Sequence, residues 1–172
     1  DPQKGRYGTL PWGAGVPSHR RAPHPPIWVA ARDPGTFDWA VSIGASILST
    51  PLSAPAAEIA VLGEKFRKAV ADHPEVPRPR LMMQRRTCVY ERQSDWELAV
   101  RPSVEYCRYF ENLMQNSGTV TNGFPEAIPF ETIANRDNYN PQAVRRNLMF
   151  GTPDEVIRKI QIYEDAGVDQ YT

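Results

Sequence analysis

The sequence has few cysteines and no long apolar run, and these two absences narrow the class of protein. Its two cysteines, Cys88 and Cys107, fall within a predicted strand and a predicted helix. No secretory segment is in view, so we expect free thiols in a reducing compartment, and hence a cytoplasmic location. No apolar stretch approaches the ~20 residues that a membrane-spanning helix requires, so we expect no membrane partner.

The chain also has no excess of positive or negative charge. It carries 20 basic and 20 acidic side chains, and 16 of the basic ones are arginine. A surface that follows nucleic-acid phosphates needs a basic excess, so we expect no nucleic-acid partner. His19 and His24 have no cysteine or carboxylate ligand near them in the sequence, and we expect no metal site.

Both ends of the sequence look cut. It begins at Asp1, without Met, in a turn-rich stretch, and it ends at Thr172, inside a predicted strand. We therefore expect 1–172 to be a single partial domain of a longer protein. Residues 1–26 are rich in Gly, Pro and Arg without helical periodicity, which predicts a loop or arm.

The stretch from Pro25 to Ala40 predicts a buried strand that leads directly into a helix. Residues 27–31 form a short unbroken apolar run, which is typical of a strand covered on both faces. Asp33 can accept hydrogen bonds from the free N–H groups of the helix start, and Pro34 suits the first helical position. The turn Ala31–Thr36 therefore offers unpaired N–H groups and a favourable helix dipole to an anion.

The remaining chain continues this alternation of strands and helices. We predict strands at 45–50, 80–91 and 168–172, helices at 54–72, 95–114 and 152–167, and an irregular excursion at 116–147. Pro102 should kink or divide the helix at 95–114. The order predicts an α/β fold with a parallel sheet, either half of a (β/α)₈ barrel or part of a doubly wound sheet. No Gly-x-Gly-x-x-Gly follows a strand, which disfavours a Rossmann domain.

Arg85 and Arg86 are unusual in the middle of a predicted strand. Side chains alternate along a strand, so the two guanidinium groups should point to opposite sides. Because an unpaired buried guanidinium is costly, we expect either a structural salt bridge with a helix or a role in holding an anionic group.

Two motifs resemble those of the luciferase-like flavin-dependent monooxygenases. Residues 23–34 read PHPPIWVAARDP, which is similar to the family's P-H-P-P-I-W-V-A-A segment. The closing GTPDEVI … AGVD of residues 151–169 is similar to the family's late G-T-P-E-E-V … A-G-V-D helix and strand. Gly5-Arg6-Tyr7 also resembles a G-R-Y/F that precedes the first motif.

This resemblance implies a (β/α)₈ TIM barrel of which the chain holds only the C-terminal half, about strands 5–8. It implies reduced FMN with O₂ acting on a small-molecule substrate, a flavin reductase as partner, and a homo-oligomer for the full-length protein. A deazaflavin-dependent oxidoreductase and a non-catalytic half-barrel that acts in assembly are the alternatives. The cofactor phosphate would lie at Ala31, Arg32, Asp33 and Thr36. No catalytic residue is assigned, because flavin chemistry belongs largely to the cofactor.

A weaker prediction concerns the substrate pocket. Active sites of such barrels lie at the C-terminal ends of the strands. Thr50 and Pro51, which follow the strand at 45–50, are therefore candidates to line that pocket.

Overall fold

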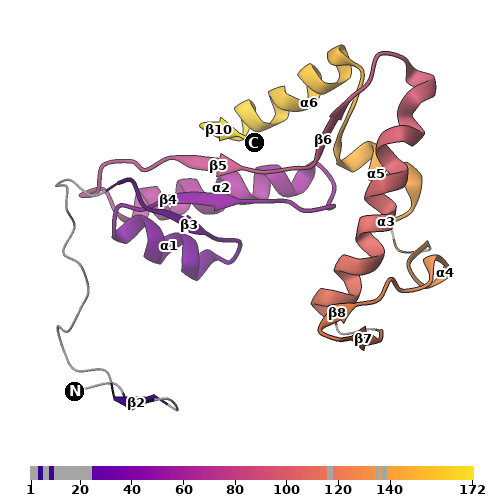
Figure 1. Ribbon diagram of the computed structural model, residues 1–172. Helices are drawn as coiled ribbons and strands as arrows, with labels where there is room; N and C mark the ends of the chain where they lie inside the picture. The colour runs from indigo at the N-terminus through magenta and orange to yellow at the C-terminus, as the bar shows by residue number, and fades with distance from the viewer. Residues whose placement is uncertain (1–3, 6–7, 10–24, 116–117, 135, 137–138) are drawn as a thin grey trace.

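The computed structural model describes residues 4–5, 8–9, 25–115, 118–134, 136 and 139–172. Its centre is a four-stranded parallel sheet (Figure 1). The strands, in spatial order, are β10 (Gln170–Tyr171), β5 (Leu81–Met83), β4 (Ser46–Ser49) and β3 (Trp28–Ala30). Each strand of this sheet therefore lies beside the sheet strand that comes before it in the sequence. The prediction of an α/β fold with a parallel sheet is confirmed.

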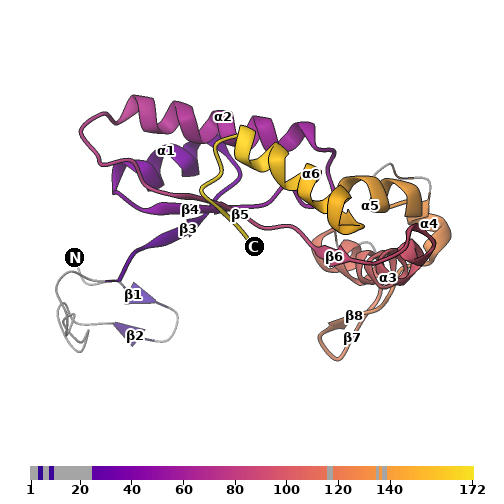
Figure 2. The same ribbon diagram turned by 90° about the horizontal axis from the view of Figure 1, so that it is seen from above.

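Three helices lie on the same face of this sheet (Figure 2). They are α1 (Pro34–Ser42), α2 (Ala57–Asp72) and α6 (Pro153–Asp165). The apolar core forms between these helices and the sheet, and its buried members include Phe37, Val41, Ile47, Ile59, Leu62, Phe66, Leu81, Met83, Val156 and Tyr163. Gly63 allows α2 to approach the end of α6 closely, because a Cβ there would collide with the carbonyl of Ala166.

The opposite face of the sheet is less covered. In a parallel pair, residues in register point to the same face, and Leu48 is in register with both Ala30 and Met82. Leu48 and Met82 are only half-buried and Ala30 is exposed, whereas their neighbours Ile47 and Leu81 are fully buried. The sheet is thus packed on one side and open on the other within the described part of the chain.

Local capping sets the starts of two of these helices, and the cap of the first is the one that the sequence predicts. The Asp33 carboxylate accepts the backbone N–H of Thr36 at 2.9 Å, and Pro34 opens α1. At α6, the Glu155 carboxylate accepts the N–H of Thr152 at 2.8 Å. Both contacts satisfy N–H groups that a helix start leaves without a partner.

The predicted single strand at 80–91 is wrong. It is divided into β5 and β6 (Thr87–Val89), which belong to different sheets. β6 pairs in parallel with β9 (Met149–Gly151), a strand that was not predicted. Because β6 pairs with β9, which lies far along the chain, the residues after Met83 leave the central sheet and join a second sheet.

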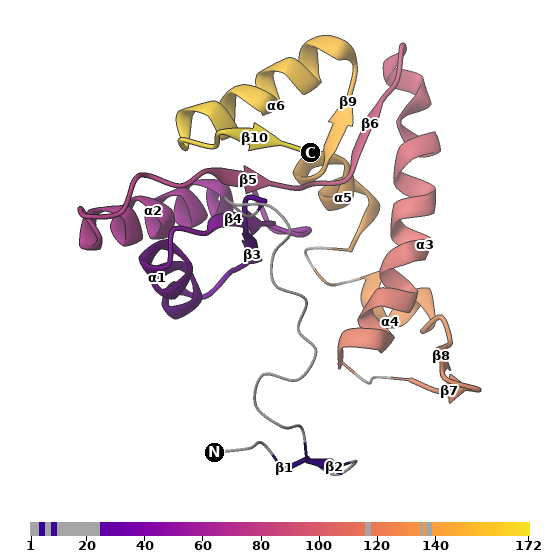
Figure 3. The same cartoon turned by 60° about the vertical axis from the view of Figure 1, so that its left-hand side comes forward.

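The described residues of the predicted irregular excursion at 116–147 include four short elements, and together with α3 they form a side unit (Figure 3). A single long helix, α3, stands apart from the central sheet, and Pro102 lies inside it without dividing it. The elements of this unit are η1 (Gln93–Asp95), α3 (Trp96–Gln115), β7 (Val120–Thr121), β8 (Phe124–Pro125), α4 (Phe130–Ala134) and α5 (Pro141–Asn147). Its own core includes Val100, Val144 and Phe150.

Within the predicted arm, the described residues form a short antiparallel pair, β1 (Lys4–Gly5) with β2 (Gly8–Thr9). His19 and His24 lie outside the described residues. None of the helices in the described ranges combines the length and apolar character that crossing a bilayer demands.

Candidate functional site

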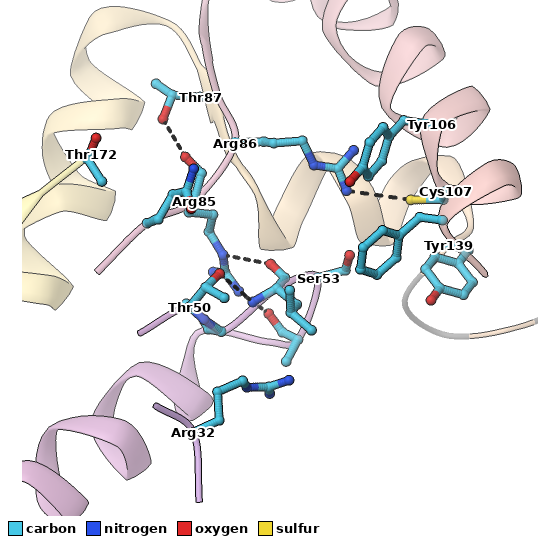
Figure 4. A pocket seen from close by; sticks show the side chains of 15 residues that line it. Arg32, Thr50, Ser53, Arg85, Arg86, Thr87, Tyr106, Cys107, Tyr139 and Thr172 are labelled. Atoms are coloured by element: carbon cyan, nitrogen blue, oxygen red, sulfur yellow. Dashed lines mark hydrogen bonds between the residues drawn. The ribbon is translucent and has the colours of Figure 1, made fainter. Parts of the chain in front are cut away.

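A pocket of about 560 Å³ lies where the four parallel strands end (Figure 4). One wall is formed by residues that follow these strands: Arg32, Thr50, Pro51, Leu52, Ser53, Ala54, Gln84, Arg85 and Thr172. The facing wall comes from the side unit: Tyr106, Cys107 and Phe110 of α3, and Tyr139. The pocket is therefore built where the central sheet meets the side unit, and its volume is within the range of small-molecule sites.

Arg85 is the buried arginine of the pocket, with 5% of its surface exposed. Its Nε donates to the carbonyl of Leu52 at 3.1 Å, and its Nη2 donates to the carbonyl of Ala54. Burial lowers the pKa of Arg85, although the hydroxyls of Tyr163 and Tyr171 partly oppose this effect. The expected salt bridge with a helix is absent among the described residues, and the guanidinium instead fixes the loop after β4.

Arg85 and Arg86 both line the pocket, so the prediction that they point to opposite sides is wrong, because residues 84–86 lie between β5 and β6 and not within a strand. The Arg85 side chain extends toward the loop after β4, and that of Arg86 extends toward α3 (Figure 4). The Arg86 guanidinium lies over the ring of Tyr106, with the Cζ atom 4.6 Å from the ring centroid. It donates to the carbonyl of Ser103 at 3.2 Å and to Sγ of Cys107 at 3.6 Å. None of these partners is a carboxylate, so no ion pair within the described residues neutralises Arg86 at the pocket wall.

Three aromatic rings line the side of the pocket on which Arg86 lies. Tyr106 and Phe110 are one helical turn apart on α3 and stack with their ring centroids 5.5 Å apart. Tyr139 donates its hydroxyl to Glu111 at 2.7 Å, and Arg136 pairs with the same carboxylate. Burial raises the pKa of Tyr139, which remains a neutral hydrogen-bond donor at pH 7.

The predicted phosphate residues lie at one end of the pocket, but only Arg32 lines it. Ala31 is buried and its N–H donates to the carbonyl of Leu48 at 3.0 Å. Asp33 and Thr36 bond to each other, because the Thr36 hydroxyl donates to Asp33 Oδ2 at 2.5 Å. This hydrogen bond lowers the pKa of the Asp33 carboxyl, so a negative charge is fixed at the turn.

Positive charge surrounds the same turn. Arg32 reaches Glu58 only at 3.7 Å, and both side chains are partly exposed, which makes the pair weak. Lys65 donates to the carbonyl of Arg32 at 2.9 Å and so joins α2 to the turn. The other two predicted pocket residues, Thr50 and Pro51, do line the pocket.

The chemistry of the pocket fits an anionic planar ligand such as a flavin nucleotide. Its lining holds three arginines and no aspartate or glutamate side chain among the described residues. Sequence reasoning missed the aromatic wall, because it assigned no aromatic residue of the helix at 95–114 to a site. Tyr106 is 50% exposed, and its spacing of four residues from Phe110 is the signal that could have identified a shared face on α3.

Comparison with known proteins now identifies the family. The sequence profile of the luciferase-like monooxygenases matches residues 4–170, nearly the whole chain. The chain belongs to the luciferase-like monooxygenase family. A relative in Acinetobacter baylyi (strain ATCC 33305 / BD413 / ADP1), the oxygenase component of a flavin-dependent trigonelline monooxygenase, is 32% identical over 168 residues. That match covers 98% of this chain but 47% of the relative, so the chain spans about half the relative's length.

Solved structures of this luciferase-like fold agree with the sheet described above. The oxygenating constituent of 3,6-diketocamphane monooxygenase from Pseudomonas putida, in complex with FMN, matches with a TM-score of 0.59 at 15% identity. The match covers 100% of this chain and 50% of that one. An F420-dependent secondary alcohol dehydrogenase matches with a TM-score of 0.59 at 18% identity, over 99% of this chain and 48% of that one. At these identities the likeness shows the fold.

Proposed function

We propose that this luciferase-like chain is the C-terminal half of a flavin-dependent monooxygenase that uses reduced FMN and O₂ to oxidise a small organic substrate. The observation that carries the proposal is the pocket at the ends of the four parallel strands, whose described lining holds three arginines and no aspartate or glutamate side chain. Flavin nucleotides bring a phosphate and a planar ring system, and this pocket offers guanidinium groups and aromatic faces to them.

The half-barrel assignment is part of the proposal. The sheet has four parallel strands in sequential order, with helices on one face only. Strands 5–8 of a (β/α)₈ barrel have the same arrangement when strands 1–4 are removed. The half-buried Leu48 and Met82 would then point into the barrel. The relatives' greater length supports this, since each contains about as much chain again.

The flavin phosphate is placed at the turn formed by Ala31, Arg32, Asp33 and Thr36. Arg32 supplies the cation, and the start of α1 supplies a positive dipole end, while the Thr36 N–H is already bonded to the Asp33 carboxylate. Asp33 shapes the turn through its bond to the Thr36 N–H. The Thr36 hydroxyl reaches a phosphate only if it leaves Asp33 Oδ2, so phosphate binding and the Asp33–Thr36 hydrogen bond compete.

The cofactor chemistry and the partners follow from the same proposal. Bound reduced flavin would supply the electrons that activate O₂, while the residues of this chain bind and orient the ligands. The relative's name designates an oxygenase component, which supports a separate flavin reductase as partner. A homo-oligomer and a cytoplasmic location remain predictions.

A deazaflavin-dependent oxidoreductase is the second candidate, supported by the F420-dependent structure with the same fold. The two differ in their need for oxygen. Substrate turnover that requires both reduced FMN and O₂ would exclude the deazaflavin candidate. A protein that assembles stably but binds neither cofactor would instead support the non-catalytic half-barrel.

The phosphate site is tested by titrating FMN into the complete protein at fixed salt, with Thr36→Ala and Arg32→Ala beside the wild type. Each substitution removes one charge-assisted contact, so we expect a loss of about 1 kcal/mol or more in binding. Arg158→Ala, which changes an exposed arginine of α6, is the matched control. Wild-type affinity in both turn variants would show that the turn only caps α1.

A further inference from the structure

The distribution of charge in the pocket points beyond flavin binding. The chain as a whole is neutral, with equal numbers of basic and acidic side chains, yet the described pocket lining contains three arginines and no acidic side chain. Such a concentration of one charge does not follow from composition. It indicates a ligand, or a pair of ligands, with more than one anionic group.

Of the three arginines, Arg86 is the one whose charge is left for a ligand. Arg32 has Glu58 within 3.7 Å, and Arg85 donates to two backbone carbonyls that fix the loop after β4. Arg86 meets a carbonyl, a thiol and an aromatic ring, and within the described ranges no carboxylate lies at ion-pair distance from it. A guanidinium has five N–H donors, and the bonds to Ser103 and Cys107 use two of them.

The wall around Arg86 is aromatic. Tyr106 lies against the guanidinium, Phe110 stacks on Tyr106, and Tyr139 completes the wall (Figure 4). Arg32, beside the proposed phosphate turn, lies on the other side of the pocket, and Arg85 lies between the two. The pocket therefore has a cationic end at Arg32 and another at Arg86. The Arg86 end is lined by aromatic rings and lies away from the proposed flavin phosphate.

We propose that the substrate is an aromatic carboxylic acid, bound with its carboxylate on Arg86 and its ring against Phe110 and Tyr139. This inference rests on the proposed function, which places the flavin phosphate at the Arg32 end. Arg86 would act as the specificity-determining residue, since a planar guanidinium pairs with a carboxylate through two parallel N–H···O bonds. The aromatic rings would select a flat substrate by offset or edge-to-face stacking.

The test measures the binding of benzoate, benzamide and cyclohexanecarboxylate to the complete, flavin-free protein by titration calorimetry. Benzamide lacks the charge and cyclohexanecarboxylate lacks the flat ring, so each isolates one half of the proposal. We expect wild-type protein to bind benzoate at least 10-fold more tightly than either analogue. Equal binding of all three, or no binding of benzoate, would overturn the proposal.

Arg86→Gln should weaken benzoate binding about 10-fold or more and leave benzamide binding within about 2-fold, because it removes a charge-assisted pair. Arg86→Lys keeps the charge but not the paired geometry, and we expect an intermediate loss. Arg101→Gln, on the exposed side of α3, is the matched control and should bind benzoate like the wild type. Unchanged near-ultraviolet circular dichroism verifies that each variant is folded.

A parallel FMN titration separates this inference from the proposed function. If Arg86→Gln weakens FMN and inorganic phosphate but leaves benzoate unchanged, Arg86 holds the flavin phosphate and the substrate assignment is wrong. If benzoate binds through Arg86 while FMN does not bind at all, the proposed flavin function fails and the carboxylate site stands.

Discussion

Arg85 donates to the backbone carbonyl of Leu52, a residue held at a φ of +51°, across a separation of 33 positions in the chain. A leucine in this left-handed region costs roughly 1–2 kcal/mol and persists only when its surroundings fix it. Leu52 belongs to the loop that follows β4 and lines the pocket. The contact therefore ties the shape of the pocket rim to a strained backbone and to one buried cation.

Replacing Arg85 by Met should destabilise the chain and loosen this rim. The substitution leaves the carbonyls of Leu52 and Ala54 without their donor, and we expect the free energy of unfolding to fall by about 1–3 kcal/mol. Denaturant unfolding measures this change. Arg158→Met, on the exposed face of α6, should shift the same quantity by less than about 0.5 kcal/mol. A more stable Arg85→Met protein would mean that the cost of burying the guanidinium exceeds its two hydrogen bonds.

Replacing Asp33 by Asn should strengthen phosphate binding at the proposed site. Asparagine also caps helices well, so α1 keeps its start, but the negative charge beside the phosphate is lost. The Thr36 hydroxyl holds the pKa of the Asp33 carboxyl below its usual value, so the wild-type group is charged throughout the neutral range. We expect FMN affinity of the complete protein to rise several-fold, with a smaller gain at high salt.

The control for this prediction is Asp154→Asn, which changes an acidic residue of the first turn of α6 instead. FMN affinity should be unchanged in that variant. Weaker FMN binding by Asp33→Asn would contradict the phosphate assignment. It would show that the negative charge of Asp33 favours FMN binding, whereas a carboxylate beside a phosphate should oppose it.

The β5–β10 edge of the sheet should be sensitive to acid through Asp169. This carboxylate pairs with Arg78 at 2.9 Å and accepts the N–H of Leu81 at 2.8 Å. Partial burial opposes ionisation, but the Arg78 guanidinium and the Leu81 N–H prevail and lower the pKa of Asp169 below its ordinary 3.8. The stabilisation is therefore present above pH 3.8 and is lost as the pH falls through the lowered value.

Asp169→Asn measures that contribution. We expect it to reduce the free energy of unfolding by about 1 kcal/mol at pH 7, and the difference from wild type to shrink below pH 3.8. Denaturant unfolding at a series of pH values gives the comparison. A difference that stays constant down to pH 2 would show that the charge of Asp169 contributes nothing.

His73 should make the α1–α2 contact weaken as the pH rises. Its Nε2 lies 2.9 Å from Asp38 Oδ1, and this hydrogen bond, with a smaller contribution from Glu75, raises the pKa of His73 above 6.5. The contact is fully stabilising below pH 6.5 and is lost as the pH rises through the raised value. We expect the melting temperature to fall between pH 6 and pH 9 by more in wild type than in Asp38→Asn. Equal pH dependence in both proteins would rule out this contact.

Those features of the fold that depend on neighbouring residues could be predicted from the sequence. The strand at 27–31, the start of α1 at Asp33 and the Thr152–Glu155 cap all depend on contacts within a few positions. The alternation of strands and helices was enough to predict the parallel sheet. The prediction that Arg85 and Arg86 point to opposite sides assumed an unbroken strand, whereas residues 84–86 lie between β5 and β6 and both arginines line the pocket.

The partners of Arg85 and Arg86 could not be predicted in this way. The sequence left a salt bridge with a helix and a role in holding an anion as alternatives for these arginines, yet Arg85 donates to a loop that precedes it by more than 30 residues. Arg86 meets Tyr106, which the helical pattern alone marks as a packing residue. Nothing local distinguishes a tyrosine that packs from one that faces a pocket, because the difference lies in what the rest of the chain places opposite it.

The sequence by itself determined the family, the parallel α/β alternation and the helix caps, because motifs, periodicity and caps are encoded within short windows. Only the tertiary structure decided that the predicted strand at 80–91 is divided between two sheets, since the pairing of β6 with β9 joins residues about sixty positions apart. That division turns the chain after Met83 toward the side unit. It thereby brings Arg86 against the aromatic face of α3 and creates the pocket.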